Sequence, residues 1–207
     1  MPERVDLIVW SDYLCPWCYV AAVRLRRLED EFGDRVALEW RTFLLRPHTD
    51  PSRTLEKFRA YTASWARPAA EEDGATFNTP WSTEEGPPSH SVPPHLVAKA
   101  AAALGPDAFE AMHARLLRAY FTENHDITNG DVLLALWREV GLPDEAFERA
   151  GDDATLRTVV EQHNEAVRRE ITGVPAVLMV GNDVPVLGAM PYETYRRWVT
   201  RGLEGAV

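Results

Sequence analysis

The chain has 207 residues, of which 45% are hydrophobic, enough for the core of one large domain or of one domain carrying an insertion. Its 22 Lys and Arg residues face 32 Asp and Glu residues, for a formal net charge of −10. Nucleic-acid-binding proteins usually carry a clustered basic surface, so this balance argues against nucleic acid as a partner. The one arginine-rich stretch, residues 24–27, is interpreted as the exposed face of a helix.

The N-terminal residues hold no apolar run long enough for a signal peptide and no small-residue cleavage site. No stretch approaches the roughly 18 uninterrupted apolar residues of a membrane span. We therefore expect a cytoplasmic protein, and structural disulfides are rare in that compartment. Cys15 and Cys18 are the only cysteines of the chain. Such a close pair needs a chemical explanation.

The first 46 residues predict a β-α-β unit. Residues 5–10 form a short apolar run typical of a buried strand. Residues 19–32 carry apolar side chains at near-helical spacing and end at Gly33, a common stop signal. Residues 36–43 alternate as a second strand. The sequence Cys-Pro-Trp-Cys therefore lies where the first strand meets the helix.

A long helical region follows from about Pro47, interrupted by a loop over residues 67–95 that contains six prolines. The helical segments, separated by Gly, Pro and Asn, are predicted at residues 52–66, 96–105, 106–124, 129–142, 143–150 and 153–170. Residues 176–180 and 184–187 then predict a β-hairpin, in which Pro185 indicates an edge strand. Residues 191–203 close the chain as a helix. The order is β-α-β, helical insertion, β-β-α.

The position of the two cysteines suits redox chemistry. If Pro16 opens the helix, Cys15 lies at its N-terminus, where free N–H groups and the helix dipole stabilise a thiolate. Cys18 falls on the same face, at a Cα separation of roughly 5–6 Å that suits a disulfide. This geometry predicts Cys15 as an exposed nucleophile and Cys18 as a buried resolving thiol.

Two other interpretations of the cysteines are weighed. Both residues could be small buried hydrophobes without chemistry. A zinc site with His90 and His95 is the other, but 71 residues separate Cys18 from His90, unlike zinc-finger spacing. We therefore predict no metal.

A second informative stretch is Gly-Val-Pro-Ala at residues 173–176, directly before the hairpin. A cis bond between Val174 and Pro175 would turn the chain sharply and expose the preceding backbone to a partner. Trp17 is expected to shape the lip of the site and contact substrate, with plain solvent-facing surface as the alternative. Glu39 and Arg41 are interpreted as an exposed strand face rather than as buried proton-relay groups.

These pieces together resemble the DsbA-like branch of the thioredoxin superfamily, particularly the FrnE-like oxidoreductases. The resemblance covers nearly the whole chain. It is carried by SDYLCPWCY, AYFTENHDITNGDVLLALWREVGL, ITGVPAVLMV and LGAMPYETYRRWV. It implies an α/β thioredoxin-like fold interrupted by a helical insertion, with thioredoxin-like parts at residues 1–46 and 169–207 and the insertion at 47–168.

The resemblance also implies roles for individual residues. Cys15 would attack and Cys18 resolve, cis-Pro175 would face them, and Val174 would hydrogen-bond a substrate strand. Pro16 and Trp17 complete the expected substrate contacts. The predicted function is thiol–disulfide exchange on a protein or small-molecule substrate, without a bound cofactor. A glutathione-dependent isomerase or transferase of the kappa-class or hydroxychromene-carboxylate isomerase type is the alternative, with glutathione as co-substrate. The oligomeric state is open between monomer and homodimer.

Overall fold

The computed structural model describes residues 3–205. In chain order its strands and α-helices are β1 (Val5–Ser11), α1 (Pro16–Phe32), β2 (Val36–Thr42), α2 (Leu55–Thr62), α3 (Ala66–Ala69), α4 (Val92–Ala102), α5 (Pro106–Phe121), α6 (Gly130–Glu139), α7 (Asp144–Phe147), α8 (Asp153–Arg168), β3 (Ala176–Met179), β4 (Val186–Leu187) and α9 (Tyr192–Leu203). This is the predicted order of β-α-β, helical insertion and β-β-α, so the α/β thioredoxin-like fold is confirmed. No helix within the described range is both long and apolar enough to cross a membrane.

Within residues 3–205 the strands form one four-stranded sheet in the order β2-β1-β3-β4. β1 runs parallel to β2 and antiparallel to β3, and β4 closes the edge beside β3. Pro185, which indicated an edge strand, directly precedes β4. The sheet is therefore mixed, and its central strand β1 leads into the Cys-Pro-Trp-Cys segment.

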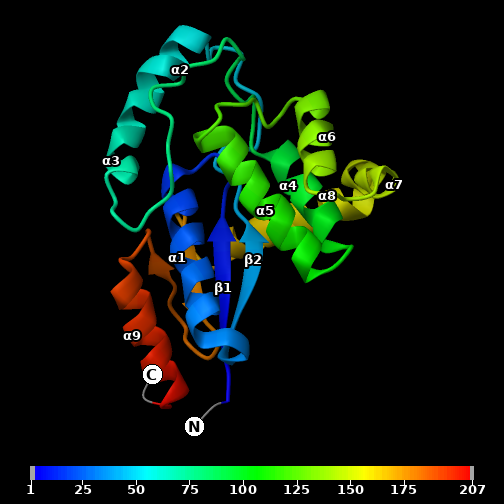
Figure 1. Ribbon diagram of the computed structural model, residues 1–207. Coiled ribbons are helices and arrows are strands. Elements are labelled where there is room, and N and C mark those ends of the chain that lie inside the picture. Colours follow the sequence, from blue (N-terminus) through cyan, green and yellow to red (C-terminus); the bar gives the residue numbers. More distant parts are fainter. Residues whose placement is uncertain (1–2, 206–207) are drawn as a thin grey trace.

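Helices cover both faces of the sheet (Figure 1). One face packs against α1 and α9, with alternate β1 residues Leu7 and Val9 fully buried. The other β1 residues, Ile8 and Trp10, pack toward Ala166 of α8. Because alternate residues of a strand point to opposite faces, burial on both sides explains why β1 is almost continuously apolar. Figure 1 shows most of the remaining helices around the end of the sheet to which β1 and β2 point.

The predicted proline-rich loop ends earlier than expected. Helix α4 begins at Val92, so Pro93 and Pro94 lie in its first turn rather than in the loop. Proline fits there because the first N–H groups of a helix have no intrahelical partner. The prediction of a loop to residue 95 is wrong for this reason.

The prediction that the arginine-rich stretch is an exposed helix face is wrong for Arg24, whose side chain is only 2% exposed. Its guanidinium donates to Glu71 at 2.5 Å and to Asp73 at 2.6 Å, both in the segment after α3. It also donates to the carbonyl of Met190 at 3.0 Å. The cation is buried because carboxylates and carbonyls replace its water. Arg26 and Arg27 are exposed, as predicted.

Candidate active site

A tight turn after β1 presents Cys15. The buried Asp12 side chain accepts hydrogen bonds from the N–H groups of Leu14 at 2.6 Å and of Leu45 at 2.8 Å. Its main-chain carbonyl accepts from the N–H of Cys15 at 3.1 Å. Asp12 therefore shapes the turn and ties it to the segment after β2. Burial raises the pKa of this carboxyl to about 6.

Cys15 occupies the position just before α1, with extended backbone angles (φ −95°, ψ 114°), and Pro16 begins the helix. Cys15 thus occupies the N-cap position of α1, as predicted, and its side chain makes no capping hydrogen bond to the helix. Cys18 lies one turn deeper and is fully buried. Burial, together with the neighbouring Cys15, raises the pKa of the Cys18 thiol well above its ordinary value.

The prediction of an exposed thiol at Cys15 is wrong, because this residue is only 5% exposed. The thiol donates a hydrogen bond to the carbonyl oxygen of Val174 at 3.3 Å, across 159 positions of sequence. This hydrogen bond confirms the predicted juxtaposition of Gly-Val-Pro-Ala with Cys15. The Val174–Pro175 bond is cis. Pro16, Trp17 and Val174 are half-buried. Their substrate contacts stay predictions.

A buried polar cluster lies behind the turn. His95 of α4 and His113 of α5 both lie edge-on to the Tyr13 ring, with centroid distances of 4.8 and 5.4 Å. Tyr13 hydrogen-bonds His113 Nδ1 at 2.9 Å, and His95 Nε2 lies 3.9 Å from Asp12. Burial lowers the pKa of His113 to about 3 and that of His95 well below its ordinary value. Both imidazoles are therefore neutral at physiological pH.

Sequence reasoning missed this cluster. The sequence suggested His95 only as a candidate zinc ligand together with His90. In the structure His95 Nδ1 lies 3.3 Å from the Thr42 hydroxyl, and the imidazole ring packs on Tyr13. No group of three or more His, Cys, Asp or Glu side chains suited to a metal occurs in residues 3–205. The role of Asp12 could have been recognised in the sequence. An Asp directly after a strand often accepts a hydrogen bond from the backbone N–H two residues later and so stabilises a turn.

The strand pair Glu39 and Arg41 does not face the cysteines. Glu39 is 57% exposed, and Arg41 forms ion pairs with Glu39 at 2.7 Å and with Glu165 of α8 at 2.5 Å. Arg41 is half-buried, so the predicted exposed face holds for Glu39 and only in part for Arg41. The ion pair between Arg41 and Glu165 attaches α8 to β2.

Comparison with known proteins agrees with this architecture. At 27% identity, the chain is similar to the uncharacterized protein YwbO of Bacillus subtilis (strain 168), across 95% of this chain and 96% of YwbO. Solved structures share the fold, among them two from Nitrosomonas europaea and Pseudomonas aeruginosa. A putative protein disulfide isomerase from Nitrosomonas europaea aligns with a TM-score of 0.81 at 18% identity, over 99% of this chain and 100% of that one. The cytosolic disulfide reductase DsbM from Pseudomonas aeruginosa with GSH aligns with a TM-score of 0.74 at 21% identity, over 96% of this chain and 99% of that one.

A protein-family model matches most of the chain. The model of the DSBA-like thioredoxin domain matches residues 6–199, a range that includes both cysteines, the whole helical insertion and the cis-proline segment. Assignment to the FrnE-like branch stays a prediction. With the thiol of Cys15 against the residue before a cis-proline, and with this match over most of its length, the chain belongs to the DSBA-like thioredoxin domain family.

Proposed function

We propose that the protein is a thiol–disulfide oxidoreductase in which Cys15 attacks and Cys18 resolves. The observation that carries this proposal is the contact of the Cys15 thiol with the carbonyl of Val174, at the N-terminus of α1. A substrate strand that pairs with the backbone at Val174 brings its disulfide against Cys15. The carbonyl that now accepts from the thiol then becomes available to the substrate.

The exchange balances in two steps. The Cys15 thiolate attacks one sulfur of the substrate disulfide, forms a mixed disulfide and releases the other sulfur as a thiolate. Cys18 then loses its proton and attacks the Cys15 sulfur, which releases the second substrate thiol and leaves a Cys15–Cys18 disulfide. The substrate gains two electrons and the protein loses two. Oxidation of a dithiol substrate is the same sequence in reverse.

Trapping the mixed disulfide tests this mechanism. The Cys18→Ala protein is expected to accumulate a covalent adduct with a disulfide substrate, seen as a mass increase that a reductant removes. The Cys15→Ser protein is expected to form none. Full disulfide-exchange activity in Cys15→Ser would contradict the assignment. Equilibration of the wild type with glutathione buffers, followed by alkylation and mass measurement, then gives the reduction potential of the Cys15–Cys18 pair. This potential decides whether the protein reduces or oxidises its substrates, because the reduction potentials of thioredoxin-like proteins span roughly −270 to −120 mV.

Glutathione is the co-substrate we propose for returning the protein to its starting state, since a structure with this fold is described as a cytosolic disulfide reductase with GSH. A cytoplasmic location is part of the same proposal. The alternative is a glutathione-dependent isomerase or transferase. It gives Cys18 no role, so glutathione-dependent turnover that survives Cys18→Ala would favour it.

A further inference from the structure

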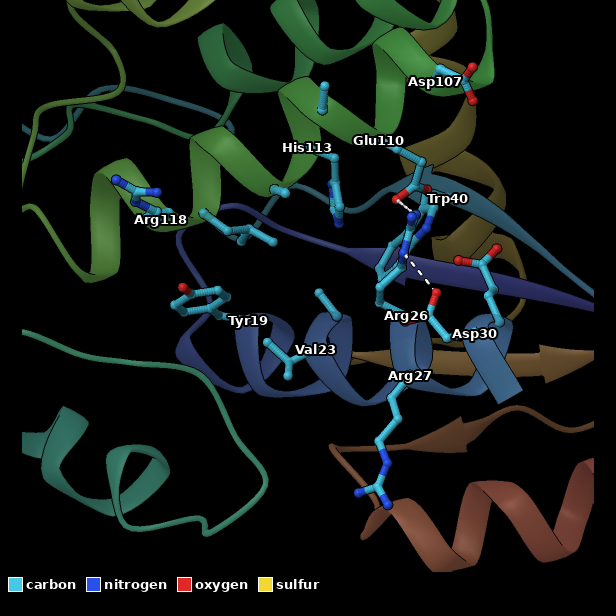
Figure 2. Close-up of a pocket in the computed structure, with 15 residues that line it drawn as sticks. Tyr19, Val23, Arg26, Arg27, Asp30, Trp40, Asp107, Glu110, His113 and Arg118 are labelled. Atoms are coloured by element: carbon cyan, nitrogen blue, oxygen red, sulfur yellow. Dashed lines mark hydrogen bonds and ion pairs between the residues drawn. The ribbon is translucent and has the colours of Figure 1, made fainter. Parts of the chain in front are cut away.

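A groove of about 910 Å³ separates α1 from α5, and its position relative to Cys15 is informative. Figure 2 shows Tyr19, Val23 and Arg26 of α1 opposite Glu110 and His113 of α5. Tyr19, Val23, Trp40 and Leu117 give much of it an apolar lining. Grooves of this size with a few convergent polar groups are typical ligand sites.

The groove begins at Tyr19, one helical turn beyond Cys15, and follows one face of α1. Tyr19, Ala22, Arg26 and Glu29 all line it, and they follow Cys15 in steps of four, three, four and three residues. Side chains with this spacing lie above one another on a helix. At a rise of about 1.5 Å per residue, Glu29 lies roughly 21 Å from Cys15. Roughly six residues of extended polypeptide span that distance.

The ion pairs along the groove leave two of its carboxylates, Glu29 and Asp107, uncompensated within residues 3–205. Arg26 is paired with Glu110 at 2.8 Å. Arg27 turns away to stack on Tyr192 at 3.7 Å, and Arg118 is paired with Glu123 at 2.8 Å. Glu29 has no ion-pair partner in the part of the chain that the structure describes. Its burial and the nearby carboxylates of Glu110 and Asp30 raise the pKa of Glu29 to about 7, against smaller lowering effects of Arg26 and the N–H of Leu38.

The floor of the groove also holds polar atoms without partners. His113, which is 5% exposed, extends from α5 into the groove (Figure 2). Its Nε2 and the Nε1 of Trp40 are buried, and neither has a hydrogen-bond partner within residues 3–205. Unpaired polar atoms of this kind cost free energy unless a ligand or water satisfies them. Indole N–H groups are donors only, so a carbonyl oxygen is the group that fits Trp40.

We propose that this groove binds the polypeptide that flanks the cysteine of a protein substrate, with a lysine or arginine of that substrate at Glu29. This inference rests on the proposed oxidoreductase function and deepens it, because it names polypeptides with a basic residue roughly six positions from the reactive cysteine as the preferred class. The apolar lining takes the aliphatic part of the side chain, Glu29 takes its charge, and Trp40 binds main-chain carbonyls. Bound cations favour the ionised form of Glu29.

Matched peptides test the preference. In each, the single cysteine carries thionitrobenzoate in a disulfide, so reduction by the dithiol protein releases a coloured thiol. One peptide has lysine roughly six residues from the cysteine on both sides and the other has glutamine there. The wild type is expected to show a kcat/KM roughly threefold to tenfold higher for the lysine peptide, as for a partly buried ion pair. Glu29→Gln removes that preference, and Asp34→Asn, an exposed carboxylate outside the groove, preserves it.

Further measurements distinguish failure of the groove proposal from failure of the proposed oxidoreductase function. Cystamine carries amines but is too short to reach Glu29, so its turnover is expected to be insensitive to Glu29→Gln. Trp40→Phe is expected to lower kcat/KM for both peptides by the same factor. Equal turnover of the two peptides by the wild type, or a preference that survives Glu29→Gln, overturns the inference while oxidoreductase activity stands. Failure of the wild type to reduce glutathione disulfide, cystamine and both peptides overturns the proposed function itself.

Discussion

Asp12 illustrates, at the scale of a single residue, how burial and hydrogen bonding compete in the turn that presents Cys15. Two N–H groups donate to this carboxylate and favour its ionised form, but complete burial opposes ionisation. Burial prevails, so the pKa is raised to about 6. The folded protein therefore holds this proton more tightly than the unfolded chain, whose Asp ionises near 4.

This shift predicts a specific dependence of stability on pH. Stability due to the protonated Asp12 is fully present below about pH 4 and is lost as the pH rises through about 6. The free energy of unfolding of the wild type, relative to Asp12→Asn, is expected to fall by on the order of 2–3 kcal/mol across that range. Urea denaturation at a series of pH values measures it.

Asp50 provides a control of opposite sign. It is exposed, and hydrogen bonds from Ser52 lower its pKa. The free energy of unfolding of the wild type, relative to Asp50→Asn, is therefore expected to rise with pH. The reason is that stability from an ionised carboxylate is lost as the pH falls through the folded-state pKa. If the difference in the free energy of unfolding between the wild type and Asp12→Asn stays constant between pH 3.5 and 6.5, the proposed burial effect is incorrect.

At the scale of elements, α9 packs closely on the sheet because it carries Gly202. A Cβ at this position would lie 2.8 Å from Met179 Sδ of β3 and 3.0 Å from a methyl group of Val5 in β1. The glycine therefore permits contact between helix and strands, although glycine lowers helix stability by about 1 kcal/mol. This packing positions the β3 strand that follows Pro175.

A pair of alanine substitutions separates packing from helix propensity. Gly202→Ala is expected to destabilise the protein by roughly 1 kcal/mol, because overpacking exceeds the gain in helix propensity. Gly130→Ala at the start of α6 has open space around its new methyl group and is expected to be neutral or slightly stabilising. Chemical denaturation midpoints compare the two. Equal effects would mean that the space around Gly202 does not limit packing.

At the scale of the whole molecule, Arg24 connects three segments that are distant in sequence. Its guanidinium joins α1 to Glu71 and Asp73 of the insertion and to the Met190 carbonyl before α9. The buried Arg24 side chain thereby holds the insertion against the thioredoxin-like part on the α1 side. On the other side of the sheet, Arg41 and Glu165 join β2 to α8.

Loss of the Arg24 cation is expected to weaken this connection. Arg24→Met would leave two partly exposed carboxylates and a carbonyl without their partner, at a cost of about 2–3 kcal/mol in the free energy of unfolding. Limited proteolysis is expected to cut residues 67–91 faster in this variant. Arg26→Met, on the same helix but 55% exposed, is the control, with an expected loss of at most about 1 kcal/mol. Equal losses would refute a special role for Arg24.

Much of the fold was predictable because its signals are local. The apolar run of β1, the alternation in β2, Pro16 at the first turn of α1 and Gly33 at its end are signals that each depend on residues near in sequence. Gly33 adopts a positive φ of 54°, which glycine tolerates easily. The prolines of α4 were misjudged because proline favours both loops and first helical turns, and only the helix that follows distinguishes the two.

The sequence by itself determined the order of elements, the position of the cysteine pair between a strand and a helix, and the family resemblance. Only the tertiary structure decided which faces meet. It buried Arg24, shielded the thiol of Cys15 against Val174, placed His95 behind Asp12 and opened the groove between α1 and α5. These contacts join positions up to 166 apart in sequence. Periodicity and capping act within a few residues, whereas the docking of an insertion depends on side chains brought together from the whole chain.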